Sequence, residues 1–389
     1  MNKKIVVVGN GAAAVSAVKA IRNIDQQSEI LVFGEEKFHP YYRIKLSKSL
    51  LGGLDEEKIL IQNKQWYESN NITLCLGQRV VGLAPEKKEI ILQSGASVSY
   101  SRLLLANGAS NLTPPIEGID KLGVFTLRSL NEAFMVIDYL KNIKTVLLIG
   151  GGVQNLEIAN VLCKSGKKII IAEFAPRLMA RQLDDFASNK LKQSIESHGV
   201  EVMLNTQINE ILGNDKVEGF ITQEGIQRSC DMVIYSTGIM PNIQIAQNTS
   251  LSISRGIKVN ERMETNVNDI FAAGDIAEFN GRVYGLWSIA TQQGKIAGAN
   301  ICNQGLIFEP PAPVTIMDAF GLSLNSIGDI EERQDTELLI EVDDKNNRYY
   351  KLFIRNKRIV GAIILGDTKK FMTIKNFIEK KRKLISISN

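Results

Sequence analysis

A carboxylate near residue 275 stands where ligand chemistry can be expected. The apolar stretch 270–272 predicts a short strand, and it runs directly into Ala273-Gly274-Asp275. Glycine lets a ligand approach the backbone closely, and the Asp275 carboxylate can accept a hydrogen bond from a ribitol or ribose hydroxyl. Such a triplet alone is most often a turn with a helix cap. Its meaning therefore depends on two glycine-rich stretches that precede it.

The first glycine-rich stretch lies near the N-terminus. An apolar run at 5–8 is typical of a buried parallel strand, and a helical pattern follows it. Between them stand Gly9, Gly11 and Ala14, in the order Gly-x-Gly-x-x-Ala. Gly9 permits a tight turn, Gly11 lets a pyrophosphate touch backbone N–H groups, and Ala14 lets the helix pack closely on the strand. This stretch predicts a dinucleotide-binding loop.

The second glycine-rich stretch repeats this unit about 140 residues later. An apolar run at 145–149 predicts a buried strand, and Gly150 and Gly152 occupy the first two glycine positions. Asn155 stands at the third position, where Gly or Ala is usual. Its larger side chain is expected to move the helix outward at a packing cost of ~1 kcal/mol, and to weaken the site without abolishing it.

An acidic residue follows each loop at the distance expected for ribose recognition. Glu35 lies 24 residues after Gly11 of the first loop, and Glu173 lies 21 residues after Gly152 of the second loop. A carboxylate there accepts hydrogen bonds from ribose hydroxyls and repels a 2′-phosphate. Glu173 therefore favours NADH over NADPH, and the nearby Arg177 weakens that preference.

The order of these motifs predicts a split first domain. It suggests a flavin nucleotide bound by the two ends of the chain and a nicotinamide nucleotide bound by its middle. The expected fold is α/β, with two Rossmann-like FAD/NAD(P)-binding domains, the second inserted in the first, plus a small α+β C-terminal domain. The expected segments are 1–110 and 241–308 for the FAD-binding domain, 111–240 for the NADH-binding domain and 309–389 for the C-terminal domain.

The C-terminal segment carries strand patterns and a basic end. Residues 336–342, 348–354 and 359–365 predict antiparallel strands, and a basic helix that includes Lys380–Lys383 is expected to close the chain. Such a charge run is usually a solvated helix face. The alternative interpretation is a docking surface for an acidic electron carrier, since electrostatic steering needs local charge.

Composition excludes several classes of protein. The net charge is only +4 over 389 residues, so nothing favours nucleic acid as a partner. The sequence has no run of 18 apolar residues and begins without a cleavable signal, so we expect no membrane span and a cytoplasmic location. Four scattered cysteines and two histidines argue against a local dithiol and against a metal site. The cysteines are Cys75, Cys163, Cys230 and Cys302.

Four motifs follow one another along the chain. They are the first glycine loop, the second glycine loop, the Thr-Gly-x-x-Pro-Asn turn at 237–242 and the Ala-Ala-Gly-Asp stretch at 272–275. Together they resemble the flavoprotein reductases with two dinucleotide-binding domains that are related to glutathione reductase, over about residues 4–305. Within that group three features are most similar to NADH:rubredoxin oxidoreductases and to the flavin part of NADH-dependent nitrite reductases. They are the motif from Pro40 to Lys48, Trp287 with Gln293-Gly294, and the tail 361–368.

The resemblance implies non-covalent FAD and NADH as cofactors, and a set of residues that hold them. Gly9, Gly11 and Ala14 would hold the FAD pyrophosphate, Glu35 its adenosine ribose and Asp275 its ribitol. The other FAD contacts are expected at Arg43, Lys48, Val80, Gly108 and Trp287, and the NADH contacts at Gly150, Gly152, Glu173 and Gly238.

The resemblance also implies that Lys48 lies beside flavin N5 and pairs with Glu157. The positive end of such a pair would stabilise the electron-rich reduced flavin and help to align the nicotinamide for hydride transfer. The alternative is an ordinary surface ion pair worth less than ~1 kcal/mol. Asn107 departs from the family pattern, which usually has Thr there, and is expected to alter a contact beneath the adenine half of the flavin.

The implied activity is electron transfer from NADH through FAD to a small acidic one-electron carrier protein, similar to rubredoxin. Alternatives within the same family are a flavin module for nitrite reductase or ferredoxin, or an NADH oxidase. Thiol-dependent peroxidases and CoA-disulfide reductases place a redox cysteine in the segment 41–48, which has none here. A flavin-binding sensor without turnover is an alternative from another class, and Asn155 motivates it.

Overall fold

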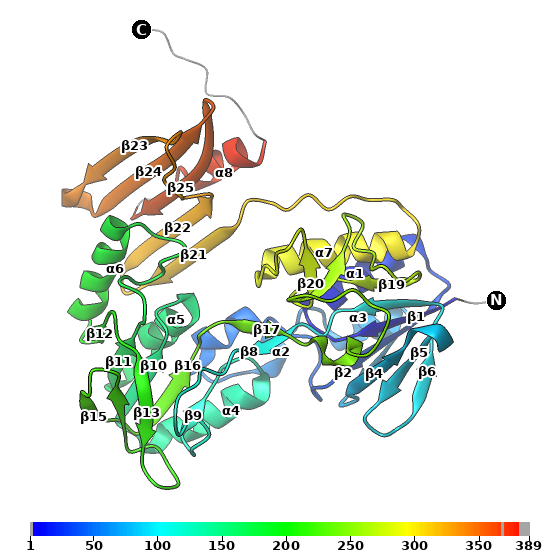
Figure 1. Ribbon diagram of the computed structural model, residues 1–389, viewed down its shortest axis with the longest axis horizontal. Coiled ribbons are helices and arrows are strands. Elements are labelled where there is room, and N and C mark those ends of the chain that lie inside the picture. The colour runs from blue at the N-terminus through cyan, green and yellow to red at the C-terminus, as the bar shows by residue number, and fades with distance from the viewer. Residues whose placement is uncertain (1–2, 367–368, 381–389) are drawn as a thin grey trace. The chain divides into compact units, whose positions relative to one another are not determined.

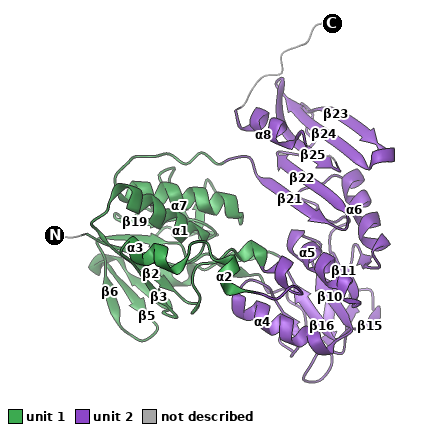
Figure 2. Cartoon of the chain, turned by 180° about the vertical axis from the view of Figure 1, so that it is seen from behind, with its two compact units in different colours: residues 1–45, 55–112, 238–310 green, residues 46–54, 113–237, 311–389 purple. Residues whose placement is uncertain are grey.

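The computed structural model describes residues 3–366 and 369–380. The chain divides into two compact units, which Figure 2 shows in different colours. Unit 1 comprises residues 1–45, 55–112 and 238–310, and unit 2 comprises 46–54, 113–237 and 311–389. The division into an FAD-binding, an NADH-binding and a C-terminal domain stays a prediction. The two compact units differ from this predicted division, because unit 2 combines the C-terminal segment and residues 46–54 with the middle of the chain.

A parallel five-stranded sheet forms the centre of unit 1 (Figure 1). Its strand order is β19-β7-β1-β2-β3, and each neighbouring pair is parallel. The apolar runs that predicted strands in this part of the chain are therefore confirmed. The strands are β1 (Lys4–Val8), β2 (Glu29–Gly34), β3 (Ile72–Leu76), β7 (Arg102–Leu105) and β19 (Ile270–Ala272).

Two helices pack face to face beside this sheet. They are α1 (Ala12–Ile24) and α7 (Trp287–Ile301). Glycines let them approach closely, because a β-carbon on Gly294 would lie 2.1 Å from the carbonyl oxygen of Ala13. The sequence pattern predicts this second helix over residues 284–300, and the predicted start is wrong. Gly285 adopts a left-handed φ of +64° and Leu286 is extended, so the helix begins at Trp287.

Smaller elements complete unit 1. The sequence pattern at 77–92 predicts a hairpin around Pro85, and the structure confirms it as β4 and β5, joined by a 3₁₀ turn at Pro85–Lys87. The other pairings are β5 with β6, β8 with β17, and β18 with β20. The elements are α2 (Glu56–Ile59), α3 (Lys64–Ser69), β4 (Val80–Ala84), β5 (Glu89–Leu92), β6 (Ser97–Ser99), β8 (Ala109–Asn111), β17 (Ile239–Pro241), β18 (Ile257–Val259) and β20 (Ala277–Phe279).

Unit 2 contains a second parallel sheet with the same central arrangement. Its order is β12-β11-β10-β16-β9, so β10 lies between β11 and β16 as β1 lies between β2 and β7. This correspondence confirms the internal repeat. The strands are β9 (Val124–Phe125), β10 (Thr145–Ile149), β11 (Lys168–Ala172), β12 (Glu201–Met203) and β16 (Met232–Tyr235). Three helices and an antiparallel sheet accompany it: α4 (Leu130–Tyr139), α5 (Val153–Leu162), α6 (Asp185–Ser197), β13 (Ile208–Leu212), β14 (Gly219–Thr222) and β15 (Gln227–Ser229).

The C-terminal part of unit 2 is an antiparallel sheet with one helix packed on it. The order is β21-β22-β25-β24-β23. The three predicted strands are confirmed, and two further strands precede them. The elements are β21 (Val314–Ala319), β22 (Leu322–Gly328), β23 (Glu337–Asp343), β24 (Arg348–Arg355), β25 (Arg358–Leu365) and α8 (Phe371–Glu379).

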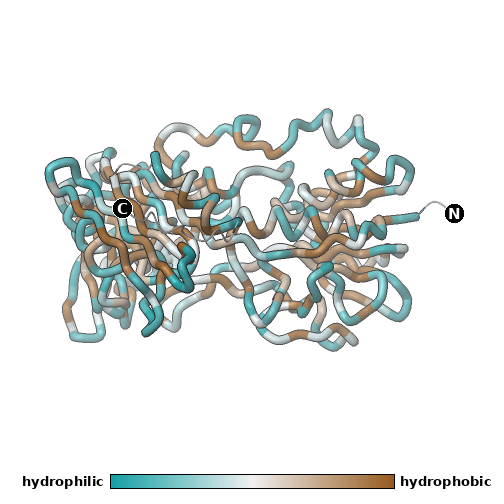
Figure 3. The backbone as a smooth tube through the Cα atoms, turned by 90° about the horizontal axis from the view of Figure 1, so that it is seen from above, coloured by the Kyte–Doolittle hydropathy of each residue, from teal (hydrophilic) through white to brown (hydrophobic). Residues whose placement is uncertain are grey.

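The predicted basic end is described only in part. Lys380 follows the last residue of α8, and Lys381, Arg382 and Lys383 lie outside the described residues, as do Asp367 and Thr368 of the tail motif. No helix in the described ranges has the length and apolarity needed to cross a bilayer. In Figure 3, hydrophobic stretches follow the strands and helices inside each unit, and hydrophilic stretches gather in outer loops.

A buried lysine ties the C-terminal sheet to α6. The Lys351 side chain is only 7% exposed, and its Nζ lies 2.9 Å from Asp184 and 2.7 Å from Glu332. Tyr349 donates its hydroxyl to the same Asp184 at 2.6 Å, and Asp184 also caps α6 by accepting from the Ala187 N–H. Burial opposes ionisation of Asp184, but these hydrogen bonds outweigh it and hold its pKa below the ordinary value.

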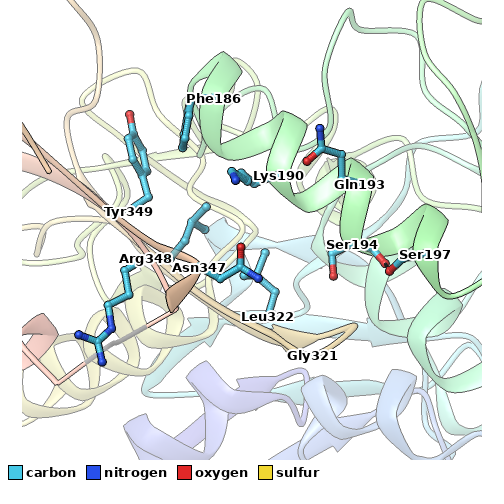
Figure 4. Close-up of a pocket in the computed structure, with 11 residues that line it drawn as sticks. Phe186, Lys190, Gln193, Ser194, Ser197, Gly321, Leu322, Asn347, Arg348 and Tyr349 are labelled. Carbon is cyan, nitrogen blue, oxygen red and sulfur yellow. Dashed lines mark hydrogen bonds between the residues drawn. The ribbon is translucent and has the colours of Figure 1, made fainter. Parts of the chain in front are cut away.

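A polar cavity of about 260 Å³ lies beside this contact. It is lined by one face of α6 and by the turns that begin β22 and β24, as Figure 4 shows. Its polar side chains come mainly from Lys190, Gln193, Ser194, Asn347 and Arg348.

Candidate active site

The first glycine loop lies at the carboxyl edge of the unit 1 sheet. Gly9 adopts φ +102°, and a β-carbon there would lie 2.2 Å from the Ala106 carbonyl oxygen, so glycine is required for β1 and β7 to continue side by side. Gly11 precedes the first residue of α1, and no atom lies within 4 Å of the place its β-carbon would take. The N-terminus of α1 therefore has an open approach of the kind that binds phosphate.

Two amide side chains near this edge each have a buried polar atom with unused hydrogen-bonding capacity. The Gly274 N–H donates to Oε1 of Gln293 at 2.8 Å, and Gln293 is 1% exposed. Its Nε2 has no hydrogen-bond partner among the described residues, and neither does Oδ1 of Asn107. Buried polar atoms are normally satisfied, so these two atoms indicate a polar ligand. The residues present thus fit FAD, with Asp275 directly after Gly274.

Asn107 has a structural partner that the sequence did not suggest. Its Nδ2 donates to the Asn242 carbonyl oxygen at 2.9 Å, and Nδ2 of Asn242 donates back to the Asn107 carbonyl oxygen at 2.9 Å. Ser110 also donates to the Asn242 side chain at 2.7 Å. These hydrogen bonds join the two chain segments that pair as the antiparallel strands β8 and β17. The expected effect of Asn107 on the adenine half of the flavin stays a prediction.

Three expected FAD residues of unit 1 have defined protein partners. The Glu35 carboxylate is exposed at the end of β2 and lies 3.4 Å from Arg79. Arg43 pairs with Glu36 at 2.5 Å. The Trp287 ring lies 5.4 Å from the ring of Tyr42.

The other expected FAD residues differ in exposure. Val80, the first residue of β4, is buried in the hydrophobic core. Gly108 follows Asn107 and adopts φ +67°. Ala14 is fully buried on α1. Whether each of them contacts FAD stays a prediction.

The second glycine loop has the same construction in unit 2. Gly150 adopts φ +105°, and a β-carbon there would lie 2.5 Å from the Ser236 carbonyl oxygen. Gly152 precedes α5 and has open space around it, as Gly11 does before α1. Asn155 is fully buried, and its Nδ2 donates to the carbonyl oxygens of Ile149 and Gly150 at 2.8 and 2.9 Å. Its amide therefore ties α5 to the end of β10, and the predicted weakening of the site stays a prediction.

Glu173 lies against this loop. Its carboxylate accepts hydrogen bonds from the N–H groups of Gly151 and, at 2.7 Å, Ala175. Arg177 is directed to the start of α6, where it lies 3.2 Å from Asp185. Gly238 belongs to unit 1, where its carbonyl oxygen accepts from the Leu112 N–H at 2.9 Å, and its expected NADH contact stays a prediction.

The ion pair that the resemblance implied is present within unit 2. Nζ of Lys48 lies 3.2 Å from Oε1 of Glu157, and Ser47 donates its hydroxyl to Oε2 at 2.6 Å. The Glu157 side chain is 13% exposed and the Lys48 side chain 59% exposed. The α5 helix thus holds the 3₁₀ turn η2 (Ser47–Ser49) through one carboxylate. Ser47 lies within the motif from Pro40 to Lys48, but nothing in the sequence indicated this contact.

All four cysteines are free thiols. Burial raises the pKa of each thiol, and that of Cys230 to about 12. Thiols in this state are poor nucleophiles. The structure therefore gives no support to a thiol-based site, and the roles of the glycine loops, the acids that follow them and the Lys48–Glu157 pair stay predictions.

Comparisons with known proteins agree with this geometry. Residues 3–294 match the family described as pyridine nucleotide-disulphide oxidoreductase, and residues 313–382 match the rubredoxin NAD+ reductase C-terminal domain. The chain is 33% identical over 381 residues to a nitrite reductase [NAD(P)H] of Bacillus subtilis, covering 97% of this chain and 47% of that protein. It spans about half the length of the first curated relatives it matches.

A relative of similar length is the NADH-rubredoxin oxidoreductase of Clostridium acetobutylicum. It is 30% identical over 386 residues, which cover 99% of this chain and 97% of that protein. A crystal structure of NADH:rubredoxin oxidoreductase from the same species superimposes with a TM-score of 0.83 at 30% identity, covering 100% of this chain and 98% of that one. The chain belongs to the pyridine nucleotide-disulphide oxidoreductase family.

Proposed function

We propose that this protein passes electrons from NADH, through bound FAD, to a small acidic one-electron carrier protein such as rubredoxin. The observation that carries the proposal is the pair of open glycine loops, one in each unit, each at the carboxyl edge of a parallel sheet. The relative from Clostridium acetobutylicum, whose name includes both NADH and rubredoxin, supports the choice of donor and acceptor.

The proposed roles follow from the local chemistry. In unit 1, Gly9 and Gly11 leave the N-terminus of α1 open to the FAD pyrophosphate, and Gln293 and Asn107 offer buried polar atoms to the same ligand. Asp275 would accept from a ribitol hydroxyl. When bound, the flavin supplies the conversion between a two-electron donor and a one-electron acceptor.

In unit 2 the glycine loop and Glu173 would bind NADH. The carboxylate can accept from both ribose hydroxyls, and Arg177 is engaged with Asp185 and with backbone carbonyl oxygens, which supports NADH over NADPH. Lys48, held by Glu157, would provide a positive charge for the electron-rich reduced flavin.

The carrier and the location are also proposals. A net charge of +4 suits an acidic protein partner better than nucleic acid. Free cysteines are usual in the reducing cytoplasm, which we propose as the location.

The acceptor can be tested by direct competition. Purified protein is supplied with NADH and, separately, with rubredoxin, a ferredoxin or O₂, and the initial rate of acceptor reduction is compared. We expect rubredoxin to be reduced fastest, with a rate that falls as salt screens the charges. Rates that are equal for all acceptors, or fastest with O₂, would contradict the proposed carrier.

A second candidate function is a flavin module that supplies electrons for nitrite reduction. The 33% identity to part of a larger nitrite reductase favours it. In that case rubredoxin would be reduced poorly, and a separate nitrite-reducing protein would restore NADH consumption.

A further inference from the structure

Phe174 is the most exposed large apolar side chain in the described ranges, with 73% of it accessible. It follows Glu173 directly, at the carboxyl end of β11. A single exposed apolar side chain needs no special explanation on an ordinary surface. This one adjoins the carboxylate that faces the second glycine loop, so its position can matter for a ligand there.

The backbone on both sides of Phe174 is fixed. The Glu173 carbonyl oxygen accepts from the Thr206 N–H at 2.9 Å, and the Ala175 carbonyl oxygen accepts from the Asn205 N–H at 3.1 Å. The Ala175 N–H also donates to the Glu173 carboxylate at 2.7 Å. The phenyl ring is therefore carried by a short turn with anchors on either side rather than by a loose loop.

The chemistry of the ligand places a base near this ring. In a dinucleotide the ribose whose hydroxyls bind the acid also carries the adenine, so the base must lie within a few bonds of the carboxylate. An adenine presents a flat π-face, and aromatic side chains stack on such faces. Phe174 offers an aromatic face with no polar group to compete for hydrogen bonds.

We propose that Phe174 is the stacking surface for the adenine of NADH. This inference rests on the proposed function of the second glycine loop. The ring would contribute to binding of the adenosine half of the dinucleotide and would not touch the nicotinamide half. Because stacking depends on a flat ring, an aromatic replacement should retain the contact and an aliphatic one should lose it.

The test compares ligands with and without adenosine. Anaerobic stopped-flow reduction of the flavin is measured with NADH and with reduced nicotinamide mononucleotide, which lacks adenosine. For Phe174→Ala we expect the NADH concentration at half-maximal rate to rise roughly ten- to a hundredfold, the usual range for loss of one stacked base. The values for the mononucleotide should not change. Calorimetric titration with ADP-ribose should show the same loss without any turnover.

Three variants complete the design. Phe174→Tyr should bind like the wild type, Phe174→Leu should resemble Phe174→Ala, and Phe134→Ala removes another exposed phenylalanine, on α4, as a control. The stacking role would be overturned if Phe174→Ala left the NADH concentration at half-maximal rate unchanged. It would also be overturned if that concentration rose equally for the mononucleotide. Failure of NADH to reduce the wild-type flavin would instead contradict the proposed function.

Discussion

The Glu157 carboxylate joins α5 to two residues of η2. It receives both Lys48 and Ser47, and it is much less exposed than the lysine it holds. An ion pair with one exposed partner adds little to stability. In the proposed function, the pair positions the lysine and so affects the rate of flavin reduction rather than the stability of the fold.

Glu157→Gln should separate these two effects. The amide can still accept from Ser47 but no longer attracts Lys48, so we expect flavin reduction by NADH to slow about tenfold, or ~1.4 kcal/mol. FAD content and melting temperature should stay close to the wild type. Glu196→Gln, which breaks an exposed pair with Lys192 on α6, is the control. A reduction rate equal to that of the control would leave Lys48–Glu157 as an ordinary surface pair.

Asp275→Ala tests the other carboxylate at the proposed site. Loss of the acceptor for a ribitol hydroxyl should lower the FAD content of the purified protein, read as the ratio of flavin to protein absorbance. Glu261→Gln, an exposed acid in the same unit, should keep full flavin content. Full yellow occupancy in Asp275→Ala would refute the assigned contact.

At the scale of single residues, the sequence identified backbone requirements well and side-chain partners poorly. Gly9 and Gly150 follow from strand-loop-helix context, because no other residue permits that approach. The partners of Asn107 and Ser47 lie 135 and 110 residues away in the chain. No local pattern encodes such a pairing, so only the folded structure reveals it.

Helix α7 illustrates how packing, rather than propensity, sets an element. It places Gly294 and Gly298 against α1, where added β-carbons would lie 2.1 and 2.3 Å from the carbonyl oxygens of Ala13 and Ala17. Glycine disfavours helices, so its presence there reflects the close approach of two backbones. The helix also carries Gln293, and its position therefore affects the proposed flavin site.

Gly294→Ala should force α7 away from α1. Overpacking of this kind typically destabilises by ~1–3 kcal/mol, so we expect a lower midpoint in urea unfolding and reduced FAD content. Gly52→Ala is the control, because Gly52 has ordinary backbone angles and no atom within 4 Å of an added β-carbon. Stability equal to that of the control would mean that the helices can separate without cost.

Among the elements, the strands with continuous apolar runs were predicted correctly, and β21 and β22 were not predicted. These two strands follow the proline-rich segment 309–313, and polar residues interrupt their apolar residues without a regular period. β21 pairs with β22, and β22 also pairs with β25. These contacts stabilise both strands, although the local sequence of each does not favour a strand. Tertiary pairing of this kind is the usual reason that strand prediction fails.

On the scale of the whole molecule, the C-terminal sheet shares unit 2 with the second nucleotide-binding fold. The contact between them includes the buried Lys351, which lies between Asp184 and Glu332. A buried charge is tolerated only when it is paired, so this cluster should make the two parts of unit 2 unfold together.

Asp184→Asn removes the charge but retains a side chain that can cap α6. The pKa of Asp184 is lowered in the folded protein, so its ionised form stabilises the fold above the ordinary carboxyl pKa, and that stabilisation is lost as the pH falls through the folded value. We expect a loss of about 2 kcal/mol at pH 7 that shrinks below pH ~4, measured by urea unfolding. Asp185→Asn, at an exposed neighbour, should show neither effect. A difference that is independent of pH would contradict the ionic contribution.

The most direct test of the central claim is an anaerobic titration of the purified flavoprotein with NADH, followed by the absorbance of the flavin. If electrons enter a bound flavin with no thiol partner, about one NADH per flavin should bleach the yellow band completely, and replacing all four cysteines with serine should not change that end point. An end point near two NADH per flavin would reveal a second redox pair. No bleaching at millimolar NADH would contradict the proposed enzyme altogether.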